Sequence, residues 1–308
     1  MKFPFLLILF FLINNTFAKS QELYSKAYGN PKNPAIIYVH GGPRGNATLF
    51  EGTTASSLAK KGFYVIAYDR RGEGRSFDSL ATFTFNEAIN DLDKVLDKFH
   101  IKKATIIGHS FGGIVATLYT SLRSEKVERL ILVGALFSQQ ETYNHILSST
   151  KKLALAKHDE VGITQISLIK TLDRKSAEYR KLCYEIASRY KYFSMPRPTA
   201  ESTKLQLEYQ NSEFSRTNIR NDKAPLLFYK NERLVNIDTK KTLKKIQDNK
   251  VKLFGIYGKE DQIFSSKQIA DIQNLIGVKN FELIDNCSHY PFVDQQEIFI
   301  RAILRFMS

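Results

Sequence analysis

The sequence predicts an α/β fold: a mostly parallel, doubly wound sheet flanked by helices, with a helical cap inserted between two strands. Short apolar runs alternate with segments of helical periodicity from Ala35 onward. These runs are almost continuously apolar, as expected of parallel strands that are buried on both faces. The alternation stops at about residue 137 and resumes at about residue 250. Repeated βα units place helices on both faces of the sheet, and the interruption predicts the cap.

The predicted strands span residues 35–39, 63–68, 104–107, 128–136, 251–257 and 281–284. The predicted helices of the core span residues 52–61, 85–99, 112–122, 266–275 and 295–306. Between the two groups, the stretch 137–249 is rich in Lys, Glu, Tyr and Ser and contains a helical patch at 176–190. We therefore expect a core formed by residues 19–136 and 250–308, with residues 137–249 as the inserted cap.

Residues 1–18 have the layout of a secretory signal peptide. Lys2 provides a positive end, the run from Phe3 to Ile13 is apolar, and a polar stretch ends on Ala18. The run is shorter than the roughly 20 residues that span a bilayer. We expect the segment to be removed, without stable membrane insertion afterwards, and the protein to be periplasmic or secreted. Its retention as a membrane anchor is the alternative.

The formal net charge of +14 suggests attraction to anionic partners. The lysines are scattered, however, in pairs at the ends of predicted elements, and no nucleic-acid-binding motif accompanies them, so we expect no nucleic-acid partner. Cys183 and Cys287 do not require a disulfide. No clustered Cys or His spacing indicates a metal site, and no cofactor is expected. We expect a small-molecule or short-peptide substrate and leave the oligomeric state open.

The segment Gly108-His109-Ser110-Phe111-Gly112 lies between a predicted strand and a predicted helix. A Gly-x-Ser-x-Gly turn in this context is typical of a nucleophile elbow, in which a tight turn exposes the serine hydroxyl. The turn is so sharp that Gly108 and Gly112 must be small. The helix N-terminus also favours negative charge that develops beside it. Ser110 is therefore the predicted nucleophile, and the predicted chemistry is acyl transfer.

A serine nucleophile requires a base, and the base requires an orienting acid. In a fold of this kind the acid and then the histidine follow the serine along the chain. His289 lies in the loop after the last predicted strand, and Asp261 follows the strand before it. We predict His289 as the base and Asp261 as the acid. Glu260 is the adjacent alternative to Asp261.

Acyl transfer also requires two backbone N–H groups aimed at the developing oxyanion. Phe111, directly after the serine, is predicted to supply one of them. The second should come from the loop His40-Gly41-Gly42-Pro43, where glycines allow close approach of the backbone. Gly42 is preferred over Gly41 as the donor.

Together with the elbow, the segments His40–Pro43 and Asp69–Ser76 resemble those of prolyl iminopeptidase-like α/β-hydrolases, in the same order. The resemblance extends from about Ala35 to the C-terminus and includes the remaining triad positions, Asp261 and His289. It implies a capped serine hydrolase that removes an N-terminal residue, usually proline, from a peptide. It also implies an amine-binding glutamate in the cap. Glu208 is the candidate, with an exposed helix charge as the alternative.

The sequence departs from the family pattern at the elbow. His109 and Phe111 stand where the family has Gly and Trp, and the chain contains no Trp. The elbow with His before the serine is shared with many esterases and lipases. From the resemblance we expect a proline iminopeptidase-like aminopeptidase, and these departures give a carboxylesterase or lipase-type hydrolase of small acyl esters as the alternative. A non-catalytic binding protein of the same fold is a further alternative.

Overall fold

The computed structural model describes residues 21–308, so the predicted signal peptide lies outside the described residues. These residues contain a seven-stranded sheet with the order β1-β3-β2-β4-β5-β6-β7. The strands are β1 (Ser25–Tyr28), β2 (Ala35–Val39), β3 (Tyr64–Tyr68), β4 (Ala104–His109), β5 (Val127–Val133), β6 (Lys252–Gly258) and β7 (Phe281–Ile284). β1 runs antiparallel to β3, and every other neighbouring pair is parallel. The predicted α/β class with a mostly parallel sheet is confirmed.

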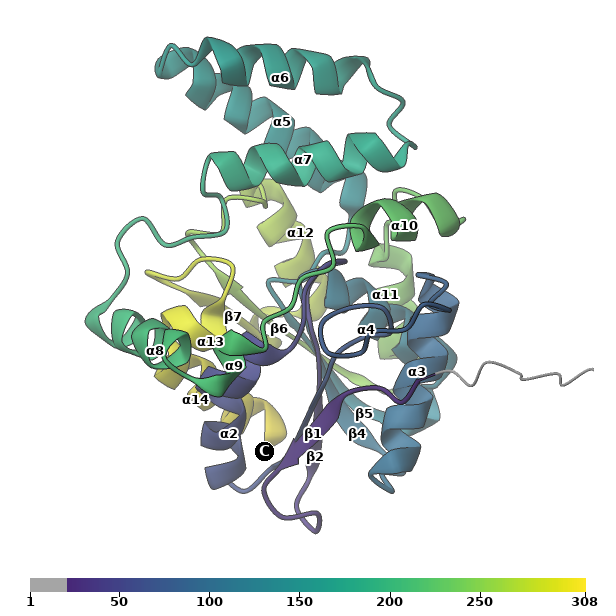
Figure 1. Cartoon of the computed structure of the whole chain (residues 1–308). Helices are drawn as coiled ribbons and strands as arrows, with labels where there is room; N and C mark the ends of the chain where they lie inside the picture. The colour runs from purple at the N-terminus through teal and green to yellow at the C-terminus, as the bar shows by residue number, and fades with distance from the viewer. Residues whose placement is uncertain (1–20) are drawn as a thin grey trace, which may run out of the picture.

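Helices cover both faces of the sheet, as Figure 1 shows. The core helices are α1 (Thr48–Phe50), α2 (Ser56–Lys60), α3 (Phe85–Lys98), α4 (Phe111–Leu122), α12 (Ser266–Ile276), α13 (Pro291–Asp294) and α14 (Gln296–Met307). A π-helical stretch, η1 (Glu51–Ala55), joins α1 to α2, and two 3₁₀ turns are η2 (Ser124–Lys126) and η3 (Val278–Asn280). Apolar side chains of α3, α4 and α12 form one core, and those of α2 and α14 form a second on the opposite face. This two-sided burial explains why the parallel strands are continuously apolar.

The first strand was not among the predicted elements. β1 has four residues, all at least partly exposed, and it lies at the sheet edge beside β3. A short edge strand lacks the continuous apolar run that identified the other strands, so only its pairing with β3 reveals it. The predicted strand over 128–136 ends early, at Val133, because Gly134 adopts a positive φ of 47° and turns the chain.

Between β5 and β6 the chain forms helices and one isolated β-bridge, between Ser138 and Asp238. The helices are α5 (Gln139–Ala156), α6 (Glu160–Thr171), α7 (Ala177–Arg189), α8 (Ala200–Gln210), α9 (Glu213–Arg216), α10 (Ala224–Asn231) and α11 (Lys240–Asp248). α5, α6 and α7 stack beyond one end of the sheet, whereas α11 packs against α4 and β6 in the core layer (Figure 1). We therefore propose that the cap ends near residue 239, before α11, rather than at residue 249.

Two further features of the described chain bear on the expectations above. Cys183 and Cys287 are both buried, and neither forms a disulfide. Within residues 21–308, the apolar character needed to cross a bilayer is not sustained over the length of any helix.

Candidate active site

Ser110 lies at the junction of β4 and α4, where the chain turns from strand to helix. Its φ of 53° and ψ of −124° are unusual for a residue with a side chain and mark a strained turn. A Cβ atom on Gly112 would lie 2.2 Å from the carbonyl oxygen of Val39, and one on Gly108 would lie 2.8 Å from the Cβ of Ala116. Glycine at both positions therefore allows α4 to pack directly against the sheet and to present Ser110 at its end.

His289 and Asp261 form a buried pair. Nδ1 of His289 lies 2.7 Å from Oδ2 of Asp261, and both side chains are at most 2% exposed. Asp261 comes from the turn after β6, and His289 comes from the loop after β7. The neighbouring Glu260 uses its backbone N–H to bind the carbonyl of Cys287 over 2.8 Å. The structure thus places Asp261, rather than Glu260, against the ring of His289.

Ser110 and His289 line one cavity of about 370 Å³. It lies between the core and the cap, because its walls include Gly41 and Gly42 from the loop after β2 as well as Phe193 from the loop after α7. Several rings line it: Tyr38, Tyr184, Phe193, Tyr209, Tyr229, Tyr290 and Phe292. The predicted serine, histidine and glycine loop therefore meet at one cavity, whose wall combines these rings with polar and charged side chains.

The backbone around Gly41 leaves an N–H group available in this cavity. The carbonyl oxygen of Gly41 accepts hydrogen bonds from Nη2 of Arg70 at 2.9 Å and from Nδ1 of His40 at 2.6 Å. The Gly41–Gly42 peptide is trans, so the N–H of Gly42 points away from these donors. A Cβ atom on Gly41 would lie 3.0 Å from the Cβ of Ser110. The loop thus runs directly beside the serine.

Phe111 is the first residue of α4, and a first-turn N–H has no acceptor within its own helix. Among the described residues, neither the Phe111 N–H nor the Gly42 N–H has a backbone or side-chain acceptor. Two unpaired N–H groups, one on the residue after Ser110 and one on the loop that runs beside it, are the donors that an oxyanion at Ser110 requires.

A buried ion pair holds the glycine loop in place. Nη2 of Arg70 lies 3.0 Å from Oε2 of Glu73, and both side chains are at most 3% exposed. Arg70 also donates to the carbonyls of His40 and Gly41, and Glu73 accepts the backbone N–H of Arg44 at 2.8 Å. Burial raises the pKa of Glu73, while the Arg70 guanidinium opposes the rise. The loop conformation therefore depends on charges supplied by the next loop along the sheet.

His40 is fixed as a neutral ring. Its Nε2 accepts the backbone N–H of Arg70 at 3.0 Å, which leaves Nδ1 to donate to Gly41. Burial, followed by the charge of Arg70, holds the pKa of His40 well below its usual value. His40 thus braces the glycine loop.

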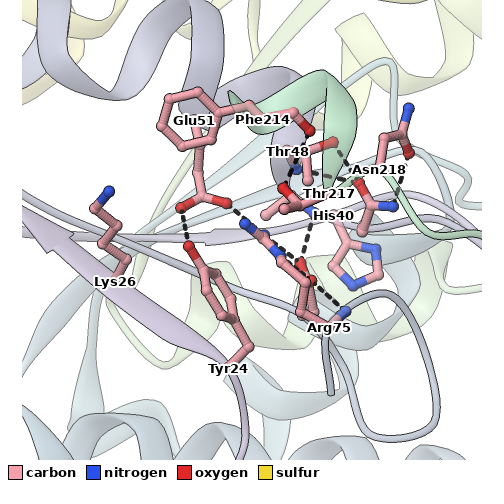
Figure 2. Close-up of polar contacts among 12 residues, drawn as sticks. Tyr24, Lys26, His40, Thr48, Glu51, Arg75, Phe214, Thr217 and Asn218 are labelled. Atoms are coloured by element: carbon pink, nitrogen blue, oxygen red, sulfur yellow. Dashed lines mark hydrogen bonds and ion pairs between the residues drawn. The ribbon is translucent and has the colours of Figure 1, made fainter. Parts of the chain in front are cut away.

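A second network connects the edge strand β1 to the core. Figure 2 shows Tyr24 and Arg75 directed at the carboxylate of Glu51. Arg75 also binds Asp69, with 2.7 Å between Nε and Oδ2, and Tyr28 donates to Glu51 at 3.0 Å. β1 was not among the predicted elements, so the sequence did not indicate the contacts that Tyr24 and Tyr28 make with Glu51.

His109 holds the loop that carries His289. Its Nε2 donates to the carbonyl oxygen of His289 over 2.9 Å, because that oxygen can only accept. Burial, followed by the nearby His289, lowers the pKa of His109 to about 3. The His109 ring is therefore a neutral donor near neutral pH.

The cavity contains two carboxylates, and each has a cationic partner. Oε1 of Glu185 lies 2.5 Å from Nζ of Lys181, and Oδ1 of Asp222 lies 3.3 Å from Nε of Arg44. Glu208 lies elsewhere: it is on α8, its side chain is 59% exposed, and its nearest cation is Lys204 at 3.9 Å. It borders a separate surface hollow, so the structure does not bring it to the cavity of Ser110.

No group of three or more His, Cys, Asp or Glu side chains in the part of the chain that the structure describes could hold a metal ion.

Comparison with known proteins identifies the family. The family model described as alpha/beta hydrolase fold matches residues 34–296. A putative proline iminopeptidase of Mycoplasma pneumoniae is 28% identical over 43% of this chain and 42% of its own length. An sn-1-specific diacylglycerol lipase of Danio rerio is 24% identical over 91% of this chain and 80% of its own length. The first match thus spans less than half of that relative.

Solved structures agree on the fold. The proline iminopeptidase-related protein from Thermus thermophilus superposes with a TM-score of 0.67 at 20% identity, over 92% of each chain. This superposition shows the shared fold, and the resemblance inferred from the glycine loop and the elbow is confirmed by the family model and by the relative from Mycoplasma pneumoniae.

Proposed function

We propose that this chain, which belongs to the alpha/beta-hydrolase family, is a serine hydrolase that cleaves carboxylic esters through an acyl-enzyme on Ser110. The observation that carries the proposal is the buried contact of 2.7 Å between His289 and Asp261, in the same site as the elbow serine. A histidine held by a carboxylate is the arrangement that activates a serine hydroxyl.

In the proposed mechanism, His289 takes the proton of Ser110 as the serine oxygen attacks the ester carbonyl. Asp261 holds the imidazole with Nδ1–H toward its carboxylate and stabilises the imidazolium that forms. The N–H groups of Gly42 and Phe111 receive the oxyanion. His289 then protonates the leaving alcohol, and in the second half-reaction it takes a proton from the water that hydrolyses the acyl-enzyme.

Esters are preferred to peptides because of the charges in the cavity. An aminopeptidase must bind the ammonium group of its substrate, and this requires an uncompensated carboxylate near the serine. Glu185 and Asp222, the carboxylates that line the cavity, are each paired with a cation. The aromatic walls suit an apolar acyl or alcohol group.

A proline iminopeptidase is the second candidate. The names of the Mycoplasma and Thermus relatives favour it, as does the position of Glu185 and Asp222 in the cavity. A substrate ammonium would have to displace Lys181 or Arg44 from its carboxylate. The lipase from Danio rerio, matched over most of both chains, favours the ester reading instead.

The test uses a fluorophosphonate probe and two substrate series. We expect the probe to label the wild-type protein and not Ser110→Ala. We also expect turnover of short-chain p-nitrophenyl esters but not of proline or alanine p-nitroanilide. A folded wild type that resists labelling would contradict the serine mechanism. Turnover of the anilides at rates comparable to the esters would favour the iminopeptidase.

We further propose that residues 1–18 direct export. Sequencing the N-terminus of the protein recovered outside the cytosol tests this. A start near Lys19 is expected, and a protein found intact with Met1 in the cytosol would contradict export.

A further inference from the structure

Three cationic side chains line the cavity of Ser110: Arg44, Lys181 and Arg220. Arg44 is paired with Asp222, and Lys181 is paired with Glu185. Within residues 21–308, Arg220 has neither an ion pair nor a hydrogen bond. Because both cavity carboxylates are already compensated, Arg220 leaves the site with an excess positive charge.

The backbone around Arg220 is held by the core on both sides. The side-chain amide of Asn46 donates to Oδ1 of Asn218 at 2.9 Å and to the carbonyl of Ile219 at 2.7 Å. On the other side, the amide of Asn221 donates to the carbonyl of Gly72 at 2.8 Å. Figure 2 shows Asn218 beside Thr48, close to the buried network of Glu51 and Arg75.

Asn46 is in turn fixed by its own neighbours. Its Oδ1 accepts the hydroxyl of Thr48 at 2.7 Å, and the Thr48 hydroxyl lies 2.9 Å from that of Tyr209 on α8. The segment that carries Arg220 is thus attached to the chain that follows the glycine loop. A cation displayed from a fixed backbone loses less entropy when it binds a ligand.

Arg220 lies near the catalytic histidine loop. It lines the same cavity as Tyr290, the residue after His289. The charge of Arg220 also opposes the rise that burial causes in the pKa of the Tyr290 hydroxyl, which places the two groups within electrostatic reach. An anion bound at Arg220 would therefore belong to a substrate that reaches Ser110.

A second uncompensated cation stands behind the cavity wall. Arg180 on α7 is 1% exposed, and its guanidinium lies 5.2 Å from the ring centre of Tyr229, which lines the cavity. Its hydrogen bond goes to the carbonyl of Lys175 at 3.3 Å, and no carboxylate pairs with it among the described residues. A buried charge acts through the protein with little screening, so Arg180 adds to the positive potential of the cavity.

We propose that Arg220 binds a carboxylate carried by the substrate, so that the preferred substrates are esters with a free carboxylate group. This inference rests on the proposed ester hydrolysis. The planar guanidinium offers two parallel N–H donors that match the two oxygens of a carboxylate. The aromatic walls then hold the part of the substrate between the carboxylate and the ester.

The test compares matched anionic and neutral esters. In the first pair, the p-nitrophenyl monoester of glutarate is compared with p-nitrophenyl valerate, so the carboxylate lies in the acyl part. In the second pair, 4-carboxyphenyl valerate is compared with phenyl valerate, so it lies in the leaving group. We expect the wild type to prefer the anionic member of one pair by about tenfold in kcat/KM, as a charged hydrogen-bonded contact provides.

The variants identify the residue responsible. Arg220→Gln should abolish the preference and leave turnover of the neutral ester within about twofold, and Arg220→Lys should retain part of the preference. Arg216→Gln, the same charge change on α9 outside the cavity, is the matched control and should keep it. The wild-type preference should also shrink as ionic strength rises.

The inference is wrong if the wild type shows no preference in either pair, or if the preference survives Arg220→Gln. Either result would leave the proposed function intact, because turnover of neutral esters and labelling of Ser110 report on it separately. Failure of both readouts would instead overturn the proposed function.

Discussion

The ring of His109 donates its Nε2–H to the main-chain carbonyl of His289 over 2.9 Å. The residue before the elbow serine thus holds the loop that carries the proposed base. The contact requires a neutral ring with its proton on Nε2, and burial supplies that condition by lowering the pKa of His109 to about 3.

Stability should therefore fall in acid. An unfolded chain protonates His109 below about pH 6.5, whereas the folded chain takes up this proton only near pH 3. Between these values the unfolded state binds more protons, so the contribution of His109 is complete above pH 6.5 and is lost as the pH falls, by up to about 1.4 kcal/mol per pH unit. Urea unfolding between pH 3.5 and 7 should show a flatter dependence for His109→Gln than for the wild type. His158→Gln, at an exposed position, should match the wild type.

Two substitutions of His109 separate its role as a hydrogen-bond donor to the His289 loop from the effect of its protonation. Gln at position 109 retains an N–H donor near the position of Nε2, so we expect ester turnover within about threefold of the wild type. Phe at this position has no donor, and kcat should fall by at least about tenfold, as expected for one lost hydrogen bond of roughly 1.5 kcal/mol. KM should change little because the ring acts through His289. Equal activity of the two variants would show that the hydrogen bond has no role in turnover.

The acid of the proposed triad can be assigned by comparing the neighbouring carboxylates Glu260 and Asp261. Asp261→Asn should lower kcat by about 10⁴-fold, because the amide can present N–H to the histidine and favour the wrong tautomer. Glu260→Gln is the matched control and should remain within about twofold. Steady-state ester hydrolysis measures both. A large effect at position 260 would reverse the assignment.

The network around Glu51 should dominate the stability of the edge strand. Glu51→Gln leaves Arg75, whose side chain is 11% exposed, with Asp69 as its remaining carboxylate partner, so the expected cost is up to about 3–5 kcal/mol, the cost of breaking a buried pair. Glu213→Gln is the control, because Glu213 pairs with Lys26 at 3.8 Å on the surface, where the expected cost is about 0–1 kcal/mol. Equilibrium denaturation distinguishes them, and similar losses would contradict the structural reading.

The hydrogen bonds of the Asn46 side chain should protect the segment that carries Arg220 from proteolysis. Asn46→Ala removes its two hydrogen bonds to residues 218 and 219, each worth about 1 kcal/mol. Cleavage by trypsin after Arg216 and Arg220 should accelerate by at least about fivefold, because local opening becomes less costly. Asn144→Ala, on the exposed side of α5, should leave the rate unchanged. Unaltered cleavage in the Asn46 variant would show that the segment is held by other contacts.

The core strands were predictable because burial on both faces imposes continuous apolar runs, and 35–39 and 281–284 match β2 and β7 in full. The elbow was predictable because its geometry demands glycines at fixed spacing. β1 was not predictable, since its four at least partly exposed residues form a strand by pairing with β3, about forty positions away.

The residues of the candidate site likewise divide into those that the sequence predicts and those that it does not. Ser110, Asp261 and His289 follow strand ends, a placement that sequence order reveals, and the structure brings Ser110 and His289 to one cavity with Asp261 behind them. The cap offered no such order. Glu208 lies outside the cavity, whereas Arg220 lines it from an irregular segment whose position depends on Asn46, far away in sequence. That Arg220 has no partner within residues 21–308 became visible once the neighbours in this range were in place.

Gly112 brings α4 against the main-chain oxygens of Val39 and His40, closer than any side chain would permit. The spacing between the proposed nucleophile and the proposed oxyanion donors is therefore set by backbone atoms, whose size does not change when residues are substituted. The cap, by contrast, reaches the cavity with replaceable side chains. Substitutions in the cap can therefore change which substrate fits the cavity and leave the spacing at Ser110 unaltered. In this architecture the proposed reaction depends on the backbone of the core, and substrate selectivity depends on the side chains of the cap, so the two can evolve independently.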